Sequence, residues 1–268
     1  MNDNSAMNMA AIPFVKASAC GNDFLIIDGL HAPPDLPAFS RSICDRHNGV
    51  GADGVEWLFP TQDADIRARL INADGSDAEI SGNGTRCVAA YLCSENRGEQ
   101  VSIRTGAGIK KCSLISRNQK SFEFEMSMGE PQIGDEFPIK LTFGEIRGIP
   151  VSMGNPHFVV FVDEFGPAWQ ADAAEIGKHH DFKYGINVEL VVVRDKGNVE
   201  VRFFERGVGE TRSSGTGSCA AAVAAIVSKR AESPVRVHAS GGSQTVRWED
   251  QIFLRGSAQL VCRGEFLL

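Results

Sequence analysis

The sequence lacks any long apolar run. Its longest one, Cys219 to Val227, spans nine residues, whereas a helix that crosses a membrane needs roughly 18. The first eleven residues also lack the charged start and apolar stretch of a secretion signal. These two features predict a cytoplasmic protein without a membrane partner.

Paired cysteines and an excess of basic residues are missing as well. The seven cysteines are an odd number, scattered and without a C-x-x-C pair, so neither a disulfide framework nor a metal site is predicted. Lys and Arg number 27 against 34 Asp and Glu, a net charge of −7. Nucleic acids bind concentrated basic patches. The composition therefore disfavours a nucleic-acid partner and favours an enzyme acting on a small molecule.

An internal repeat with an offset of 133 residues runs through the chain. Gly21-Asn22, which leads into an apolar run, matches Gly154-Asn155, which does the same. Self-similarity at one offset indicates a duplicated structural unit. We predict two pseudo-symmetric halves, residues 1–130 and 131–268, that face each other. The same offset aligns Ile43 with Ile176, His47 with His180, Arg69 with Arg202, Asp77 with Glu210, and 81–84 with 214–217.

Each half has the same coarse plan of a strand, a helix, two strands and a glycine-rich turn that opens a second helix. Both second helices, 85–94 and 218–229, are apolar on nearly every side, which is typical of a buried helix. We expect each to lie at the centre of its half, wrapped by strands, and we expect 235–268 to close the second half. The other predicted elements are strands 24–28, 55–59, 66–71, 158–162, 188–193 and 199–204 and helices near 36–43 and 171–176.

The two glycine turns, Ser81-Gly82-Asn83-Gly84 and Ser214-Gly215-Thr216-Gly217, are the most informative features. Glycines let the backbone approach a ligand closely, and the start of a buried helix offers unpaired N–H groups and a positive dipole end. A serine in this place can also be no more than a helix N-cap. The occurrence of both turns at matching positions favours a shared cleft that holds one small anionic ligand.

Polar residues surround these turns in the sequence. His157 and Glu205 are flanked by apolar strands, where an unpaired polar group is costly to bury, so a functional role is favoured for them. For Asn22 and Asp74 a role in a turn is an equal alternative. The full set is Asn22, Asn72, Asp74 and Glu79 in the first half and Asn155, His157, Asn187, Glu205, Arg206 and Glu210 in the second.

Six short stretches that contain these turns and polar residues occur in a characteristic order along the chain. They are 19–24, 72–76, 81–87, 153–157, 205–211 and 214–217. In order and spacing they resemble the signature stretches of the diaminopimelate epimerase family, from about Phe14 to the C-terminus. The resemblance implies an α/β (α+β) fold of two halves, each a curved, mainly antiparallel sheet or barrel around a central helix, with the active site in the inter-domain cleft. It also implies a homodimer.

The resemblance further implies an amino-acid epimerase that uses neither pyridoxal phosphate nor a metal ion. Such an enzyme converts L,L- to meso-diaminopimelate for lysine and cell-wall biosynthesis. His157 and Glu205 would support the catalytic acid and base. The substrate-binding residues carried over are Asn22, Asn72, Gly82, Asn83, Asn155, Asn187, Glu205, Arg206, Gly215 and Thr216.

One departure from the family pattern concerns the chemistry itself. Family epimerases place a cysteine before each glycine turn, one to remove the α-proton and one to return it, whereas this chain has Ser81 and Ser214. A thiol has a pKa of about 8.5, and an alkyl hydroxyl is a far weaker acid. Ser81 and Ser214 are the catalytic candidates, with help from helix dipoles and a neighbouring base. Cys87 and Cys219, inside the helices, are predicted to be buried packing residues.

Three alternatives follow from the serines. The first is a lyase or isomerase of the same fold, such as a hydroxyproline dehydratase or epimerase. The second is a catalytically retired protein that binds an amino acid in the same cleft. The third is a chain in which catalytic cysteines were deliberately changed to serine.

Overall fold

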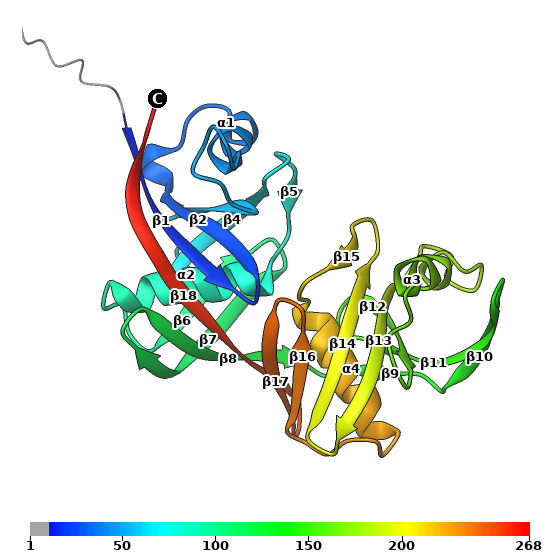
Figure 1. Cartoon of the computed structure of the whole chain (residues 1–268). Coiled ribbons are helices and arrows are strands. Elements are labelled where there is room, and N and C mark those ends of the chain that lie inside the picture. The colour runs from blue at the N-terminus through cyan, green and yellow to red at the C-terminus, as the bar shows by residue number, and fades with distance from the viewer. Residues whose placement is uncertain (1–10) are drawn as a thin grey trace, which may run out of the picture.

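The computed structural model describes residues 11–268 and places them in two halves, each built around one buried helix (Figure 1). The first half contains β1 (Ala11–Ala19), β2 (Asn22–Asp28), the 3-10 turn η1 (Gly29–His31), α1 (Leu36–Cys44), β3 (Gly54–Phe59), β4 (Ile66–Asn72), β5 (Asp77–Ala78), α2 (Gly82–Ser94), β6 (Gln100–Thr105), β7 (Gly108–Asn118) and β8 (Ser121–Gly129).

The second half repeats this order of strands and helices with two additional strands, β9 (Gln132–Ile133) and β10 (Phe137–Leu141), at its start. It then contains β11 (Gly144–Ser152), β12 (Pro156–Phe161), α3 (Trp169–Gly177), β13 (Asn187–Asp195), β14 (Asn198–Glu205), β15 (Gly209–Thr211), α4 (Gly215–Val227), β16 (Val235–Ala239), β17 (Gly242–Trp248) and β18 (Ile252–Leu267).

The first half is a closed barrel of eight strands. Its strands follow one another in the order β1, β2, β3, β4, β6, β7, β8 and β18, and β18 pairs back onto β1. The predicted fold class is confirmed, and the repeat extends to strand register. Phe24 pairs with Gly54 between parallel β2 and β3, and His157 pairs with Asn187 between parallel β12 and β13, so both partners are shifted by 133.

The two apolar helices occupy the centres of the halves, as predicted. α2 packs in a core with Phe122 and Phe124, and α4 packs in a second core with Phe203 and Leu254. Smaller cores lie beneath α1 and α3 on the outer faces. Both central helices begin three residues earlier than predicted, at Gly82 and Gly215, because the glycine turns are themselves the first helical turn.

The C-terminal strand corrects one expectation. Residues 235–268 were expected to close the second half. β18 does pair with β17 near its start, but it then continues into the first half and pairs with β1 from Gln259 to Leu267. Figure 1 shows it running from the second half along the first. The alternation of apolar and polar residues along β18 is compatible with pairing to β17 or to β1, so the sequence does not specify the partner strand. The division of the chain at residue 130 stays a prediction.

Within the described residues 11–268, no helix is both long and apolar enough to cross a membrane.

Candidate active site

Both candidate catalytic serines cap a central helix. Ser81 Oγ accepts a hydrogen bond from the backbone N–H of Gly84 at 3.1 Å, and Ser214 Oγ accepts one from Gly217 at 3.2 Å. The serines precede helix starts whose first N–H groups have no partner within the helix. Each half therefore presents a hydroxyl next to a positive helix end, where an anion is stabilised.

A buried glutamate that is not among the residues predicted from the sequence lies beneath each glycine turn. Glu56 on β3 and Glu189 on β13 are 3% and 0% exposed, and they are related by the same offset of 133. A Cβ added to Gly84 would overlap Glu56 Oε1, and one added to Gly217 would lie 2.7 Å from Glu189 Oε1. The carboxyl group below each turn therefore leaves no room for a side chain at the second glycine.

Replacing this second glycine should therefore be costly. We expect Gly84→Ala to lower the free energy of unfolding by about 1–3 kcal/mol, because the new methyl overlaps a buried carboxyl. Gly82→Ala is the matched control, since a Cβ there meets nothing within 4 Å. Urea unfolding measures both. Equal stability of the two variants would contradict the packing argument, and Glu56→Ala added to Gly84→Ala should recover part of the loss.

In the first half, a chain of side-chain hydrogen bonds leads away from the glycine turn. Asn83 Nδ2 donates to Asn22 Oδ1 at 2.7 Å, and Asn22 Nδ2 donates to Asp53 Oδ2 at 3.0 Å. Arg46 binds Asp53 and Asp23 at 2.7 and 2.8 Å. The predicted site residues Asn22 and Asn83 are therefore in direct contact and are held in fixed orientations.

The second half contains the matching chain with a histidine added. Asn155 Nδ2 donates to Thr216 Oγ1 at 3.3 Å, and this pair is the repeat of Asn22 and Asn83. Asn155 Oδ1 also meets His157 Nε2 at 3.0 Å, and His157 Nδ1 meets Glu189 Oε1 at 2.7 Å. Three predicted residues, Asn155, His157 and Thr216, are thus brought together.

His157 and Glu189 form a buried pair with 1% and 0% of their side chains exposed. Burial raises the pKa of the Glu189 carboxyl, the His157 ring opposes that rise, and the nearby charge of Glu205 adds to it. Glu189 Oε2 has no hydrogen-bond partner among the described residues. The short hydrogen bond holds the imidazole and the carboxyl in a fixed orientation in a site from which water is nearly excluded.

A buried polar bridge joins the two halves. The Arg86 side chain on α2 donates to Asn83 Oδ1. With the Gln244 amide oxygen facing Arg86, this oxygen accepts from Nη1 and Nη2 at 3.2 and 3.0 Å, and the amide nitrogen donates to Ser218 Oγ at 2.9 Å. Ser218 lies on the first turn of α4, where its hydroxyl donates to Ser214 O at 2.6 Å. The two glycine turns are therefore connected through a short chain of side chains.

A second contact between the halves is made mainly by backbone atoms. The β1–β2 turn at Cys20 and Gly21 lies against Gly241, whose N–H donates to Arg212 O at 2.8 Å. A Cβ on Gly241 would overlap Cys20 O. Next to this contact opens a polar cavity of about 580 Å³ between the halves. It is lined by Gly21, Asn22, Asp23, Arg46, Asp53, Glu210, Thr211 and Arg212.

Three further predicted residues, Asn72, Asn187 and Arg206, lie in two places. Asn72 Nδ2 donates to Ser76 Oγ at 3.0 Å within its own turn. Asn187 Oδ1 accepts from the Arg206 N–H at 2.9 Å, and Arg206 Nη1 reaches Tyr184 O at 3.2 Å. Asn187 and Arg206 are thus paired, whereas Asn72 forms hydrogen bonds within its own turn, to Ser76 and Gly75.

Cys87 and Cys219 are fully buried, as predicted, and burial raises the pKa of each thiol far above its ordinary value. They are packing residues of the two central helices. The pair Glu56 and Glu189 could have been found from the sequence by applying the 133 offset to charged residues inside predicted strands.

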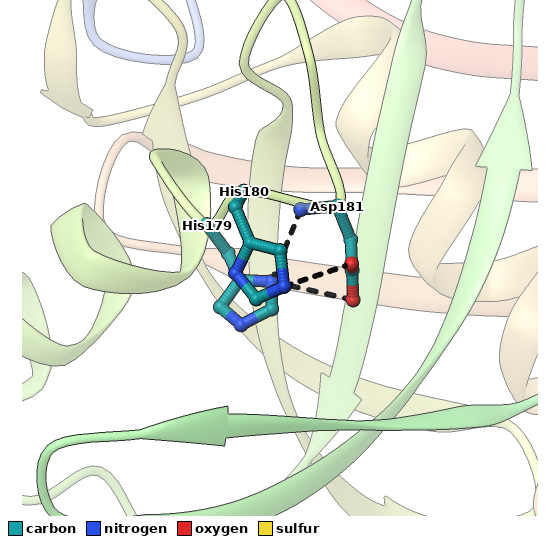
Figure 2. A group of neighbouring side chains, drawn as sticks. All are labelled: His179, His180 and Asp181. Atoms are coloured by element: carbon teal, nitrogen blue, oxygen red, sulfur yellow. Dashed lines mark hydrogen bonds and ion pairs between the residues drawn. The ribbon is translucent and has the colours of Figure 1, made fainter.

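One cluster of metal-binding residue types lies elsewhere, in the turn after α3. Figure 2 shows His179 and His180 next to each other with Asp181, and one ligand atom from each lies within 4.8 Å of the others. His180 and Asp181 are exposed, and His179 Nε2 contacts Lys140 O at 3.2 Å. Three consecutive residues of one turn bring these atoms together without any ligand, so we assign no metal to them.

Comparison with known proteins identifies relatives over nearly the whole chain. The family model described as diaminopimelate epimerase matches residues 14–134 and 149–261. Diaminopimelate epimerase of Moorella thermoacetica is 36% identical, over 95% of this chain and 99% of that protein. That of Pelotomaculum thermopropionicum is 35% identical, over 94% and 98%.

Among solved structures, a hydroxyproline epimerase from Agrobacterium vitis with bound trans-4-hydroxy-L-proline shares the fold. Its TM-score is 0.70 at 17% identity, and the match covers 96% of this chain and 93% of that one.

Proposed function

Because this chain belongs to the diaminopimelate epimerase family, we propose that it inverts the α-carbon of diaminopimelate, using neither pyridoxal phosphate nor a metal ion. The chain is an isomerase of the epimerase class. The observation that supports the proposal best is the pair of repeat-related serines, Ser81 and Ser214, each capping a central helix and joined by the buried bridge through Arg86 and Gln244.

In this mechanism the helix starts hold the substrate. The α-carboxylate would lie at the backbone N–H groups of Gly82, Asn83, Gly215 and Thr216, where two positive helix ends meet a negative charge. The same field stabilises the negative charge that develops when the α-proton leaves. Ser81 and Ser214 would then face opposite sides of the α-carbon, one removing a proton and the other returning one.

The two halves differ in how they support their serine. In the second half, the hydrogen-bonded pair of His157 and Glu189 would supply a proton, and the charge of Glu205 acts on the Glu189 carboxyl. We assign His157 and Glu205 to the support of the acid and base. We assign the distal end of the substrate to Asn72, Asn155, Asn187 and Arg206. Because the two halves are alike, residues that differ between them are needed to bind a chiral molecule in one orientation.

Incubation in heavy water, followed by NMR, tests the proposed function. L,L- and meso-diaminopimelate are expected to take up deuterium at the α-carbon and to interconvert. Hydroxyprolines serve as the second substrate panel, and a keto or imine product from them would favour the lyase alternative. Tight binding of an amino acid without deuterium uptake from any substrate would instead identify a retired binding protein.

Three broader assignments belong to the same proposal. The reaction serves lysine and cell-wall biosynthesis, the family role. Free thiols and the lack of paired cysteines support a cytoplasmic location. We also propose a homodimer, which light scattering on a sizing column would detect as twice the chain mass of 28.9 kDa.

A further inference from the structure

Glu56 is a buried carboxyl that has no role in the mechanism proposed above. It lies on the face of β3 that points toward α2, between Ile26 on β2 and Leu70 on β4. Both cross-strand neighbours are buried and apolar. A carboxyl in such surroundings is expensive unless it is neutral, paired or functional.

The Glu56 carboxyl has no partner to explain its position. Within residues 11–268 it makes no hydrogen bond or ion pair, and burial raises its pKa to about 8. The titratable group that faces it from α2 is Cys87, whose thiol is fully buried, and the charged side chains of Arg86 and Asp23 lie in the same region. Unlike Asp23 and Asp53, which bind Arg46, Glu56 has no cation bound to it among the described residues.

Glu56 lies directly at the cap of α2. Its Oε1 and the Cβ of Ser81 both border the small space beside Gly84, the Ser81 Cβ being 3.3 Å from the point where a glycine Cβ would stand. Gly84 is also the residue whose N–H binds Ser81 Oγ. The carboxyl and the hydroxyl therefore share one glycine as their common neighbour.

The repeat indicates what such a group does. Glu189, at the matching position, lies beside Gly217 in the same way, but there His157 binds the carboxyl. The first-half counterpart of His157 is Phe24, which cannot carry a proton. The second half thus has a histidine and a carboxyl behind its serine, and the first half has the carboxyl alone.

We propose that Glu56 is the proton acceptor behind Ser81, a positioning residue that lets a hydroxyl act where the family uses a thiol. This inference rests on the proposed function. The α-C–H bond breaks as an O–H bond forms at Ser81 Oγ, and the original Ser81 proton passes to the Glu56 carboxylate. A proton from Ser214 Oγ then enters the opposite face, and the His157–Glu189 pair reprotonates Ser214. Glu56 ends with one proton more and the pair with one fewer, and the reverse reaction or solvent restores both.

The test compares wild type with Glu56→Gln, which keeps shape and removes the proton acceptor. Deuterium uptake and epimerisation of diaminopimelate are followed between about pH 6 and 9. We expect kcat to fall by about a hundredfold with KM nearly unchanged, and the rise of rate with pH that Glu56 ionisation causes to disappear. Glu99→Gln, an exposed carboxyl on the same half, is the control and should leave kcat unaltered. Retention of the wild-type rate and pH profile by Glu56→Gln would overturn the proposal.

A second experiment tests the same proposal without measuring catalysis. In protein labelled with carbon-13 at the glutamate carboxyl, the Glu56 signal is assigned by its loss in Glu56→Gln and titrated in wild type and in Ser81→Ala. Coupling to the hydroxyl predicts a midpoint that moves in Ser81→Ala, and an unmoved midpoint counts against the inference. If wild type shows no deuterium uptake at all, the proposed function fails, while this titration still decides whether Glu56 and Ser81 act together.

Discussion

Replacing Ser81 and Ser214 together by cysteine is expected to raise α-proton exchange on diaminopimelate at least tenfold. A general base works best when its pKa lies near the working pH, and a thiol at a helix start approaches that condition while a hydroxyl does not. Both positions are helix caps next to unpaired N–H groups, so a thiolate would be stabilised there. A tenfold gain corresponds to about 1.4 kcal/mol in the activation barrier.

The two single substitutions measure the contribution of each serine on its own face of the α-carbon. Ser81→Cys or Ser214→Cys alone should help less, because inversion requires a competent group on each side of the α-carbon. Loss of a serine cap costs about 1 kcal/mol of helix stability, so thermal melts must accompany the rates. Rapid epimerisation by wild type together with a slower double-cysteine protein would refute the pKa argument and make serine the evolved catalyst.

Glu56→Gln is expected to make the protein more stable than wild type at about pH 8. Burial raises the folded-state pKa of Glu56 from 4.5 to about 8. Between these values the folded chain holds a proton that the unfolded chain has released, so stability is full below the unfolded pKa and is lost as pH rises toward the folded one. Inside that window the slope is about 1.4 kcal/mol per pH unit.

Urea unfolding at about pH 5, 6, 7 and 8 measures this effect. Wild type should lose stability steadily across the series, and Glu56→Gln should show a shallower slope, because an amide does not ionise. Part of the slope will remain in the variant, since burial also raises the pKa of Glu189. Identical slopes for the two proteins would mean that Glu56 keeps an ordinary pKa in the folded state.

Sequence by itself determined the architecture of this protein to a large extent. The offset of 133 predicted the duplicated fold, since a repeated pattern of strands, glycine turn and apolar helix can bury its core in only a few ways. The two Ser-Gly-x-Gly turns identified the helix starts, because caps and glycines act within one turn of chain.

Tertiary structure alone decided which distant groups meet. The family resemblance assigned His157 and Glu205 to the support of the acid and base, but it did not indicate that the His157 ring would hydrogen-bond to Glu189, the carboxyl on which the charge of Glu205 acts. It gave no sign that Arg86 and Gln244 would join the halves, or that β18 would complete the first barrel. The alternation of apolar and polar residues and the spacing of motifs predict that a residue is buried or that a strand forms. They do not specify its partner, which is selected by the packing of the whole chain.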